Sequence, residues 1–434
     1  MSDLTINGLT LSESLDDDDI IPFWKSSIGA TRGIKKKNMV FLSGGGGANP
    51  RRCICFAMYG NNKKSLLFKA GTTFLVPSGA LIVPMTFATD TVIDLTAQIT
   101  AAAAADTART GQENGKVFNL YATSERTIVV SVRTDAPSDI SPSFTEENTL
   151  WVGCFSTLCV SIPAGTTGIV PLARNSYAVG NDYVIKAPYI GDKYGFERFY
   201  TKSLTAVSSG AQYDVGTVQH TLAGWDAGDI LPESVWALGF MPRARSAVSM
   251  NNVMGAVFDP DTVVADDIYL QSGMGRNTAS VYGATHTVSR PQQNHEDDMR
   301  QVGKFLLNDE EFASAALGSN ERTSIQGAAD QTSVGGHVDT AGRRMVSFLG
   351  CEEMCGYLWQ WTRVVSANGS SGWATYDGQA SFGQTYGAAY ALLAGGFWIY
   401  SSSCGSRARN GNNARSTVNA NIGGRGAIRG SNSG

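Results

Sequence analysis

The sequence contains few charged residues and only 13 prolines. Asp, Glu, Lys and Arg make up 17% of the 434 residues, against about 25% in an average soluble protein. Long disordered regions combine high charge with low hydrophobicity, so this composition argues against them. Glycine is abundant at 49 residues, which is typical of a protein rich in strands and turns. The net charge of −4 is too small to favour nucleic acid or a membrane as a partner.

Long apolar runs and targeting patterns are also missing. The stretch that comes nearest to a membrane span, residues 386–400, is too short and is interrupted by Gly387, Gly395 and Gly396. The first residues have neither the basic nor the apolar region of a secretory signal, so we expect synthesis in a cytoplasm. In that compartment the seven cysteines are expected to stay reduced.

The sequence lacks the short motifs that mark common enzyme and metal sites. It has no GxSxG elbow, P-loop, HExxH or CxxC pair. Cys351 and Cys355 do not have zinc spacing, and on a helix they would face the same side, so we expect buried packing. We expect core thiols also at Cys53, Cys55, Cys154 and Cys159. The scattered histidines are expected to be structural or exposed; they are His220, His286, His295 and His337. These patterns predict no catalytic residue, no metal and no cofactor.

The chain divides by pattern into four parts. Residues 1–50 contain an acidic and a basic run and predict a flexible or assembly-dependent arm. Residues 51–165 predict a sandwich or prism-like β-rich domain, and residues 166–249 a β-rich connecting region. The fourth part, residues 250–434, has short helical patterns and long loops rich in Gly, Ser and Asn. The expected strands are 52–59, 65–69, 73–77, 80–83, 117–122, 127–133, 183–189 and 235–241.

Short helical patterns stand out against this background of strands. The alanine run at 101–105 is expected to be a short helix or a connector. Two further helices are predicted at 294–302 and 309–317, after the pattern changes near residue 250. Asn308 or Asp309 can cap the second of these.

The carboxyl end has an unusual composition. After Asp377 there are five arginines, no lysine and many Asn, Ser and Gly residues. A Gly-Arg stretch at 423–426 is compatible with RNA binding. However, the apolar stretch at 395–400 belongs in a folded core, and a mixture of aromatic, Asn, Ser and Gly residues is typical of surfaces that recognise proteins. We therefore favour a protein partner over nucleic acid.

Several motifs in the last part of the chain resemble the C-type lectin fold in its formylglycine-generating-enzyme-like branch. Residues 303–312 are similar to an upstream element of that branch, with Phe305 and Leu307 where Arg and Pro are usual. The resemblance covers residues 250–434 and implies an α+β C-type lectin-fold domain preceded by all-β domains. The motifs are CGYLWQW at 355–361, GGFW at 395–398, GSRA at 405–408, GRG at 424–426 and DDIYL at 266–270.

Within that branch the chain resembles the variable proteins of diversity-generating retroelements, especially receptor-binding proteins at bacteriophage tail-fibre tips. Such an element rewrites codons near the end of its target gene, with AAC and AAT as hot spots. Codons made by changing the first two bases of AAC or AAT cannot encode Lys, Glu, Gln, Met or Trp. Between Phe397 and Asn421 only Trp398 belongs to that set, and the resemblance places it at a fixed scaffold position.

The resemblance implies a variable ligand-binding surface at about 397–421, held by a fixed scaffold. Trp398 is expected to alternate with Phe397 and Ile399 along a strand, so that Trp398 is buried while Phe397, Ile399 and Ser401 are presented on the other face. The alternative is that these apolar residues are simply part of the core. The expected scaffold residues are Trp359, Trp361, Trp398, Arg407 and Arg425, the two arginines binding loop carbonyl groups. The expected ligand-binding residues are Phe397, Ile399, Tyr400, Ser401, Ser402, Ser403, Asn410, Asn412, Asn413, Ser416, Thr417, Asn419 and Asn421.

The resemblance thus predicts a non-enzymatic receptor-binding protein of a virus or prophage, made in the host cytoplasm and carried at the tail-fibre tip. Its expected partners are a host-surface protein or glycan and other virion tail proteins, and its expected state is a homotrimer. Two alternatives remain open at this point. One is a cell-surface variable adhesin. The other is an enzyme of the formylglycine-generating kind, for which the C-terminal half offers only Cys351, Cys355 and Cys404, at unmatched spacing.

Overall fold

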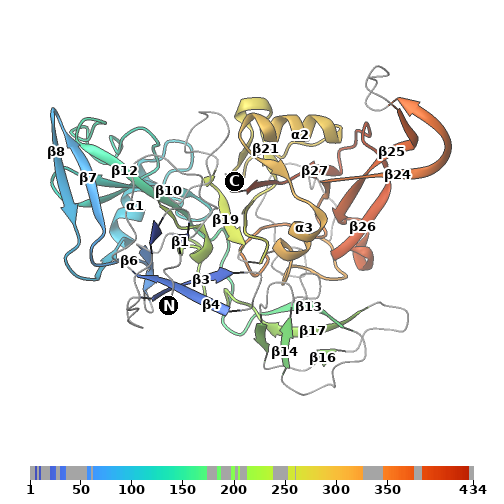
Figure 1. The fold of residues 1–434 in the computed structure, drawn as a ribbon, viewed down its shortest axis with the longest axis horizontal. Helices are drawn as coiled ribbons and strands as arrows, with labels where there is room; N and C mark the ends of the chain where they lie inside the picture. Colours follow the sequence, from blue (N-terminus) through green and yellow to red (C-terminus); the bar gives the residue numbers. More distant parts are fainter. Residues whose placement is uncertain are drawn as a thin grey trace.

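The computed structural model describes residues 62–173, 213–237, 253–259, 261–325, 346–375 and 384–429. In these parts the protein is mixed α+β, with short helices and small, mostly antiparallel sheets (Figure 1). Most of the predicted arm, together with Cys53, Cys55 and His337, lies outside the described residues. Short strands are described in addition: β1 (Thr5–Ile6), β2 (Leu9–Thr10), β3 (Ile20–Lys25), β4 (Ala30–Lys35), β5 (Phe56–Tyr59), β14 (Tyr183–Lys186), β15 (Glu197–Tyr200) and β16 (Leu204–Thr205).

The first β-rich part is built around one hydrophobic core. The structure confirms the strands predicted between residues 65 and 133, with boundaries that differ by a few residues. They form the sheets β11-β10-β12-β18 and β5-β6-β9 and the hairpin β7-β8. The strands are β6 (Asn62–Phe68), β7 (Thr73–Ser78), β8 (Leu81–Thr86), β9 (Thr91–Asp94), β10 (Val117–Thr123), β11 (Ile128–Ser131), β12 (Thr149–Ser156) and β18 (Trp236–Ala237).

Helix α1 (Thr96–Ala105) packs on this core and contains the alanine run. Ile99, Ala102 and Ala103 are fully buried and belong to the same cluster as Phe118 and Val130. Small alanine side chains let the helix lie close to the sheet. The helix expected from the alanine run is therefore confirmed, and it begins several residues earlier than the run itself.

Residues 219–236 contribute to two cores at once. Ile230 and Val235 pack into the first core, whereas Leu222 and Leu231 pack with residues of the C-terminal part. The predicted strand at 235–241 is described only as the short strand β18, which pairs with β12. A separate sheet, in the order β13-β17-β16, contains β13 (Thr167–Ala173) and β17 (Tyr213–Gln219).

The C-terminal part combines two four-stranded sheets with two short helices (Figure 1). One sheet has the order β19-β20-β28-β23, so the last described strand pairs with one of the first strands of this part. The other has the order β26-β25-β24-β27. The strands are β19 (Ala256–Asp259), β20 (Val264–Asp267), β21 (Gln271–Ser272), β22 (Ala279–Ser280), β23 (Phe305–Leu306), β24 (Trp359–Thr375), β25 (Gln384–Gly395), β26 (Gly405–Ala414), β27 (Ile422–Gly424) and β28 (Gly426–Arg429).

Both helices predicted in the C-terminal part are confirmed. Helix α2 is Gln292–Gln301 and helix α3 is Asp309–Ala315, which ends two residues before the predicted boundary. Asn308 caps α3: its Oδ1 accepts from the Glu311 backbone N–H at 2.7 Å, and Glu311 Oε2 accepts from the Asn308 N–H at 2.7 Å. This reciprocal pair satisfies two N–H groups that a helix start leaves without partners.

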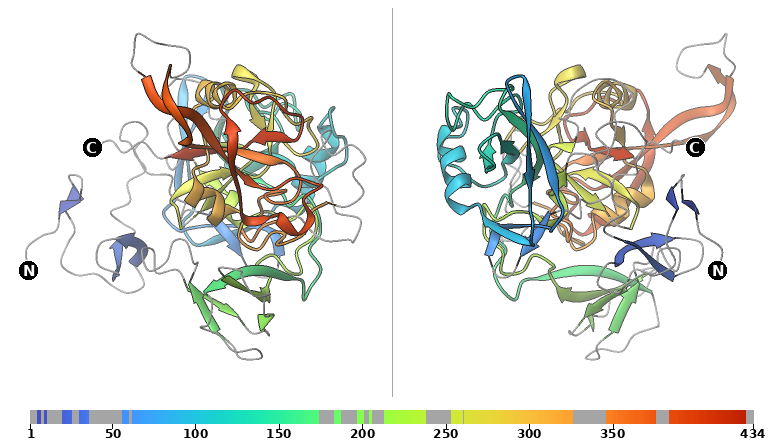
Figure 2. Two further views of the ribbon diagram at one scale, coloured as in Figure 1. Left: turned by 90° about the vertical axis from the view of Figure 1, so that its right-hand side faces the viewer. Right: turned by 60° about the vertical axis from the view of Figure 1, so that its left-hand side comes forward.

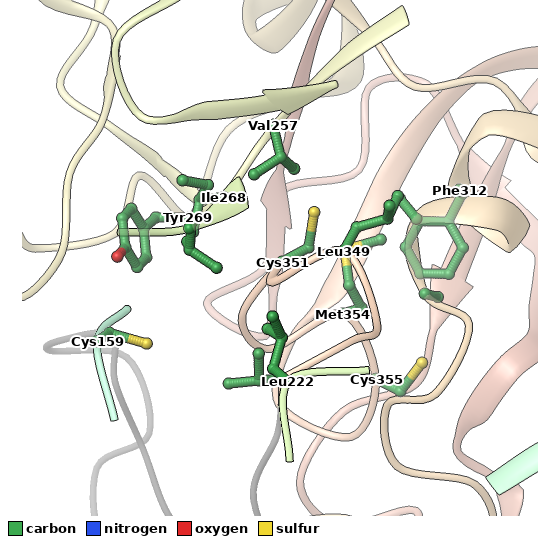
Figure 3. Packing of buried hydrophobic residues seen from close by; sticks show 14 of the residues in the cluster. Cys159, Leu222, Val257, Ile268, Tyr269, Phe312, Leu349, Cys351, Met354 and Cys355 are labelled. Atoms are coloured by element: carbon green, nitrogen blue, oxygen red, sulfur yellow. The ribbon is translucent and has the colours of Figure 1, made fainter. Parts of the chain in front are cut away.

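The hydrophobic core of the C-terminal part collects segments that are far apart in the sequence (Figure 3). Cys351 and Cys355 are fully buried in it, beside Met354, Leu349 and Phe312. The prediction of buried packing for these two thiols is therefore confirmed. The helical spacing behind that prediction is wrong, because residues 351–355 form turns and bridges instead of a helix.

Arg425 links the last strands to the rest of the C-terminal part. It lies between β27 and β28 and is 0% exposed. Its guanidinium donates to the carbonyl oxygens of Asp267 and Ile268, at 2.8 and 2.6 Å, and to that of Glu352. Its Nε donates to Gln360 Oε1 at 3.0 Å. One side chain thus satisfies buried acceptors on three other segments of the chain.

Replacing Arg425 should destabilise this arrangement strongly. In R425M, four oxygen atoms each lose a hydrogen bond from the guanidinium group, so we expect the free energy of unfolding to fall by about 3–5 kcal/mol. R425K keeps the positive charge but has no planar fork of donors, and should lie between R425M and the wild type. Chemical denaturation measures both changes. A loss below about 1 kcal/mol in R425M would contradict this role for Arg425.

Candidate ligand-binding surface

The sheet β26-β25-β24-β27 lies at one end of the molecule and carries the candidate surface (Figure 2). Strands β24 and β25 form a long antiparallel hairpin, and β27 joins β24 in parallel. Among the described strands β26 pairs with β25 alone, so it is an edge strand. The predicted variable residues therefore fall on the loop that precedes β26, on β26 itself, and on the turn that follows it.

The loop that precedes β26 turns where the sequence predicts a strand. Phe397 is only 6% exposed and bridges to Tyr357, whereas Trp398 is half-buried. Ile399 and Tyr400 are 61% and 42% exposed. The prediction that Trp398 is buried while Phe397 faces solvent is therefore wrong. The reason is a tight turn in which the Tyr400 N–H donates to the Phe397 carbonyl at 2.9 Å, so strand alternation does not apply.

Phe397 forms the buried base of the exposed loop tip. Its ring lies 4.5 Å from that of Tyr400 and 5.1 Å from that of Trp398, both in edge-on geometry. Trp359 on β24 contacts Tyr400 in the same way, at 5.8 Å. Edge-to-face aromatic pairs of this kind add stability beyond the area they bury. Tyr400 is thus supported from below while part of its ring stays accessible.

The turn into this loop requires glycine. Gly396 has φ +84°, and a Cβ at this position would lie 2.6 Å from Cys404 Sγ and 2.9 Å from Cys404 Cα. A side chain there would meet both an unfavourable backbone conformation and a buried neighbour. Cys404 Sγ in turn contacts the Phe397 carbonyl oxygen at 3.3 Å. The two ends of the loop are therefore packed directly against each other.

A carboxylate from another segment holds the beginning of β26. Glu321 Oε1 accepts from the Ser406 N–H at 3.0 Å and from the Ser406 hydroxyl group. Burial raises the pKa of Glu321 to about 7, although the Ser406 hydrogen bonds and the charges of Arg407 and Arg409 favour its ionised form. The carboxyl group of Glu321, which holds the beginning of β26, therefore titrates near neutral pH.

Two arginines that the sequence analysis left without a role hold β26 and the turn that follows it. Arg409 forms an ion pair with Asp309 at the start of α3 and lies 5.0 Å from the ring centre of Phe312. Arg415 is buried and pairs with Glu296 on α2 at 3.2 Å. These partners are 100 and 119 residues away in the sequence. No local pattern could have indicated them.

Most of the predicted ligand-binding residues reach the surface. Val418 was not predicted to bind the ligand, but it is also exposed, at 56%. Phe397 is buried, and the side chain of Ser401 lies outside the described residues. The exposed residues are Ile399, Tyr400, Ser402, Ser403, Asn412, Ser416 and Asn419, and the half-buried ones are Asn410, Asn413, Thr417 and Asn421.

The expected scaffold residues differ in their surroundings. Trp359 and Trp361 are buried on β24, and Trp361 Nε1 donates to the Arg290 carbonyl at 3.3 Å. Arg425 is buried and binds backbone carbonyls, as described above. Arg407 is half-buried on β26, as is Trp398 in the loop.

The buried thiols of this part are poorly suited to catalysis. Burial raises the pKa of Cys404 to about 12 and raises the pKa values of Cys351 and Cys355 further. Because the thiolate is the nucleophilic form, these groups are unreactive at neutral pH. In the part of the chain that the structure describes, no three His, Cys, Asp or Glu side chains are grouped as a metal site. Nor is any described helix long and apolar enough to span a membrane.

The histidines in the described residues serve as packing groups. His295 is fully buried on α2, and its Nδ1 pairs with Gln271 Oε1 at 2.6 Å. Burial lowers the pKa of His295 to about 3. His220 Nδ1 accepts from the Leu222 N–H at 3.1 Å, and its Nε2 contacts the Val346 carbonyl oxygen. The predicted structural role is therefore confirmed for these two.

The raised pKa of Glu321 predicts a specific pH dependence of stability. Between about pH 4.5 and 7 the folded state binds this proton more tightly than the unfolded state, so the contribution of Glu321 to stability falls as pH rises. E321Q keeps an oxygen acceptor for Ser406 and does not titrate. We therefore expect the melting temperature of E321Q, relative to the wild type, to increase from pH 4.5 to pH 8. A constant difference between the two proteins over that range would contradict the assignment.

Comparisons with known proteins place this fold among solved structures. The chain matches no protein-family model, and no curated protein matches it significantly. It is similar to the Major Tropism Determinant U1 variant, with a TM-score of 0.56 and 21% identity over 95% of this chain and 92% of that one. It is also similar to the M1 variant, with a TM-score of 0.55 and 22% identity over 87% of this chain and 83% of that one. At these identities the likeness shows that the chain shares the fold of the Major Tropism Determinant variants along most of its length.

Proposed function

We propose that this protein is a receptor-binding protein of a virus or prophage, of the tail-fibre-tip type. In this proposal residues 250–434 form a C-type lectin fold, and residues 397–421 bind a host-surface protein or glycan. The fold likeness to the Major Tropism Determinant variants supports the proposal, as does the order of the lectin-like motifs along the sequence. We also propose a homotrimer attached to other virion tail proteins, because several copies of a weak site raise the overall affinity.

The observation that carries the proposal is a separation of roles within residues 397–421. Phe397, Arg409 and Arg415 make the contacts that hold the loop and β26 in place. Ile399 precedes β26 and Val418 follows it, and both are exposed apolar residues, at 61% and 56% exposure. Exposed apolar side chains are candidates for contact with a partner. Side chains can therefore change on this surface without loss of the contacts that define its shape.

Retroelement diversification would use this separation directly. A loop whose exposed side chains are rewritten from one generation to the next cannot depend on those side chains for folding. Here the fixed contacts come from aromatic rings, glycine and arginine, while the exposed positions are mostly Ser and Asn with Ile and Tyr. Tyr and Ile supply contact area, and Ser and Asn supply adaptable hydrogen bonds.

Substitution of exposed and buried positions tests this separation. I399S, S402Y and S416Y change exposed side chains, so we expect the free energy of unfolding to change by at most about 0.5 kcal/mol. F397A is the matched control in the same loop and should cost about 3–5 kcal/mol, because it removes a buried aromatic ring. Urea denaturation measures all four variants. Unfolding of S402Y or S416Y would contradict the proposal that these exposed side chains can change without loss of stability.

The DNA beside the gene tests the diversification itself. We expect a near-copy of the last part of the gene, next to a reverse transcriptase gene. The two copies should differ only at adenines of the template, within codons for exposed residues such as Ile399 and Tyr400, and should agree at Trp398. Differences spread evenly over all codons, or the lack of any copy, would contradict this part of the proposal.

A further inference from the structure

A cavity of about 510 Å³ lies where the β-rich part meets the C-terminal part, away from the candidate surface. One side of it is formed by residues between Asp106 and Val132, and the other by residues between Met254 and Lys304. Its volume is within the range of small-molecule binding sites, about 300–1,000 Å³. Any ligand in this cavity would therefore touch both parts of the protein.

The charged groups around the cavity are unevenly paired. Four cations and one carboxylate line it. Lys116 is held by Asp106 at 2.6 Å, and Lys304 by Asp267 at 2.5 Å. Arg109 and Arg276, the other two cations, form no ion pair with any described residue. The cavity therefore has a surplus of positive charge supplied by two guanidinium groups.

Arg109 is fixed in place but keeps donors available. Its guanidinium lies 4.8 Å from the ring centre of Tyr282 and donates to the side chain of Gln112 and to the carbonyls of Asn114 and Gly115. These bonds use three of the five N–H donors of an arginine. Two donors remain for a ligand, on a side chain that needs no reordering to bind it.

The remaining lining is largely apolar. Val117 and Val132 come from the β-rich part, and Met254, Val281 and Val302 from the C-terminal part. Sites of this composition, with a few polar groups on an apolar wall, select a ligand by its apolar body and fix its orientation by its polar end.

We propose that this cavity binds a small organic anion, with an apolar body against the valine-rich wall and a carboxylate group bound by Arg276 and Arg109. We expect an anionic ligand because a carboxylate group forms short, charge-assisted hydrogen bonds with arginine. The bound anion stabilises the contact between the two parts of the chain. The proposal does not depend on receptor binding by the loop and β26.

The full-length protein can be titrated with hexanoate as the probe, with hexanol and acetate as controls that lack the charge or the apolar body. We expect hexanoate alone to raise the melting temperature in a saturable way, because it binds the folded state. R276Q should raise the dissociation constant about tenfold through loss of a charge-assisted bond.

R300Q is the matched control, since Arg300 is an exposed arginine of helix α2 that does not line the cavity. It should bind hexanoate like the wild type. Equal binding by R276Q and R300Q would overturn the proposal, as would the lack of saturable hexanoate binding to the folded wild type. An equal effect of hexanol would also overturn it, because it would show that charge has no part in binding.

Discussion

The C-terminal part of this protein depends on one buried guanidinium group. Arg425 directly follows β27, and it donates to acceptors on three other segments: β20 with the adjoining Ile268, β24, and the segment around Glu352. A buried positive charge is costly unless nearby dipoles compensate for it, and carbonyl groups from different segments can do so only when those segments are correctly placed. The fold of residues 253–429 and the charge of Arg425 therefore stabilise each other.

The strands next to Arg425 position the candidate surface. The strand that ends just before Arg425, β27, pairs in parallel with the start of β24, and β24 and β25 carry β26 at the edge. The loop between β25 and β26 then needs little support of its own. Gly396, the ring of Phe397 and the Glu321–Ser406 contact hold its ends. The exposed side chain of Ile399 lies outside these contacts, at 61% exposure.

The two proposed binding sites differ in the kind of ligand that their side chains suit. The loop and β26 form an open surface of Ser, Asn and exposed apolar residues, suited to a large partner whose identity changes. The cavity between the two parts is lined by cationic and apolar side chains, suited to one small ligand of constant chemistry. No residue lines both sites.

Local patterns in the sequence predicted part of the secondary structure. Alternating apolar residues indicated the strands between 65 and 133, and Asn308 or Asp309 marked the start of α3, because these signals act over a few residues. The strands β12, β24, β25 and β26 were not predicted. The lectin-like motifs led us to propose a ligand-binding region near the carboxyl end. Strand alternation failed at Phe397 and Trp398, where a turn stabilised by Gly396 and by contacts with Tyr357 replaces the expected strand.

Composition and short-range pattern thus indicated several of the strands, the helices and a candidate ligand-binding region. Only the tertiary structure decided that Phe397 is the buried base of the loop, that Arg409 and Arg415 hold β26, and that Glu321 anchors its beginning. It also decided where two guanidinium groups meet around a cavity. The physical reason is distance along the chain. These contacts join residues up to more than a hundred positions apart, and burial and desolvation act on neighbours in space, which a local pattern does not record.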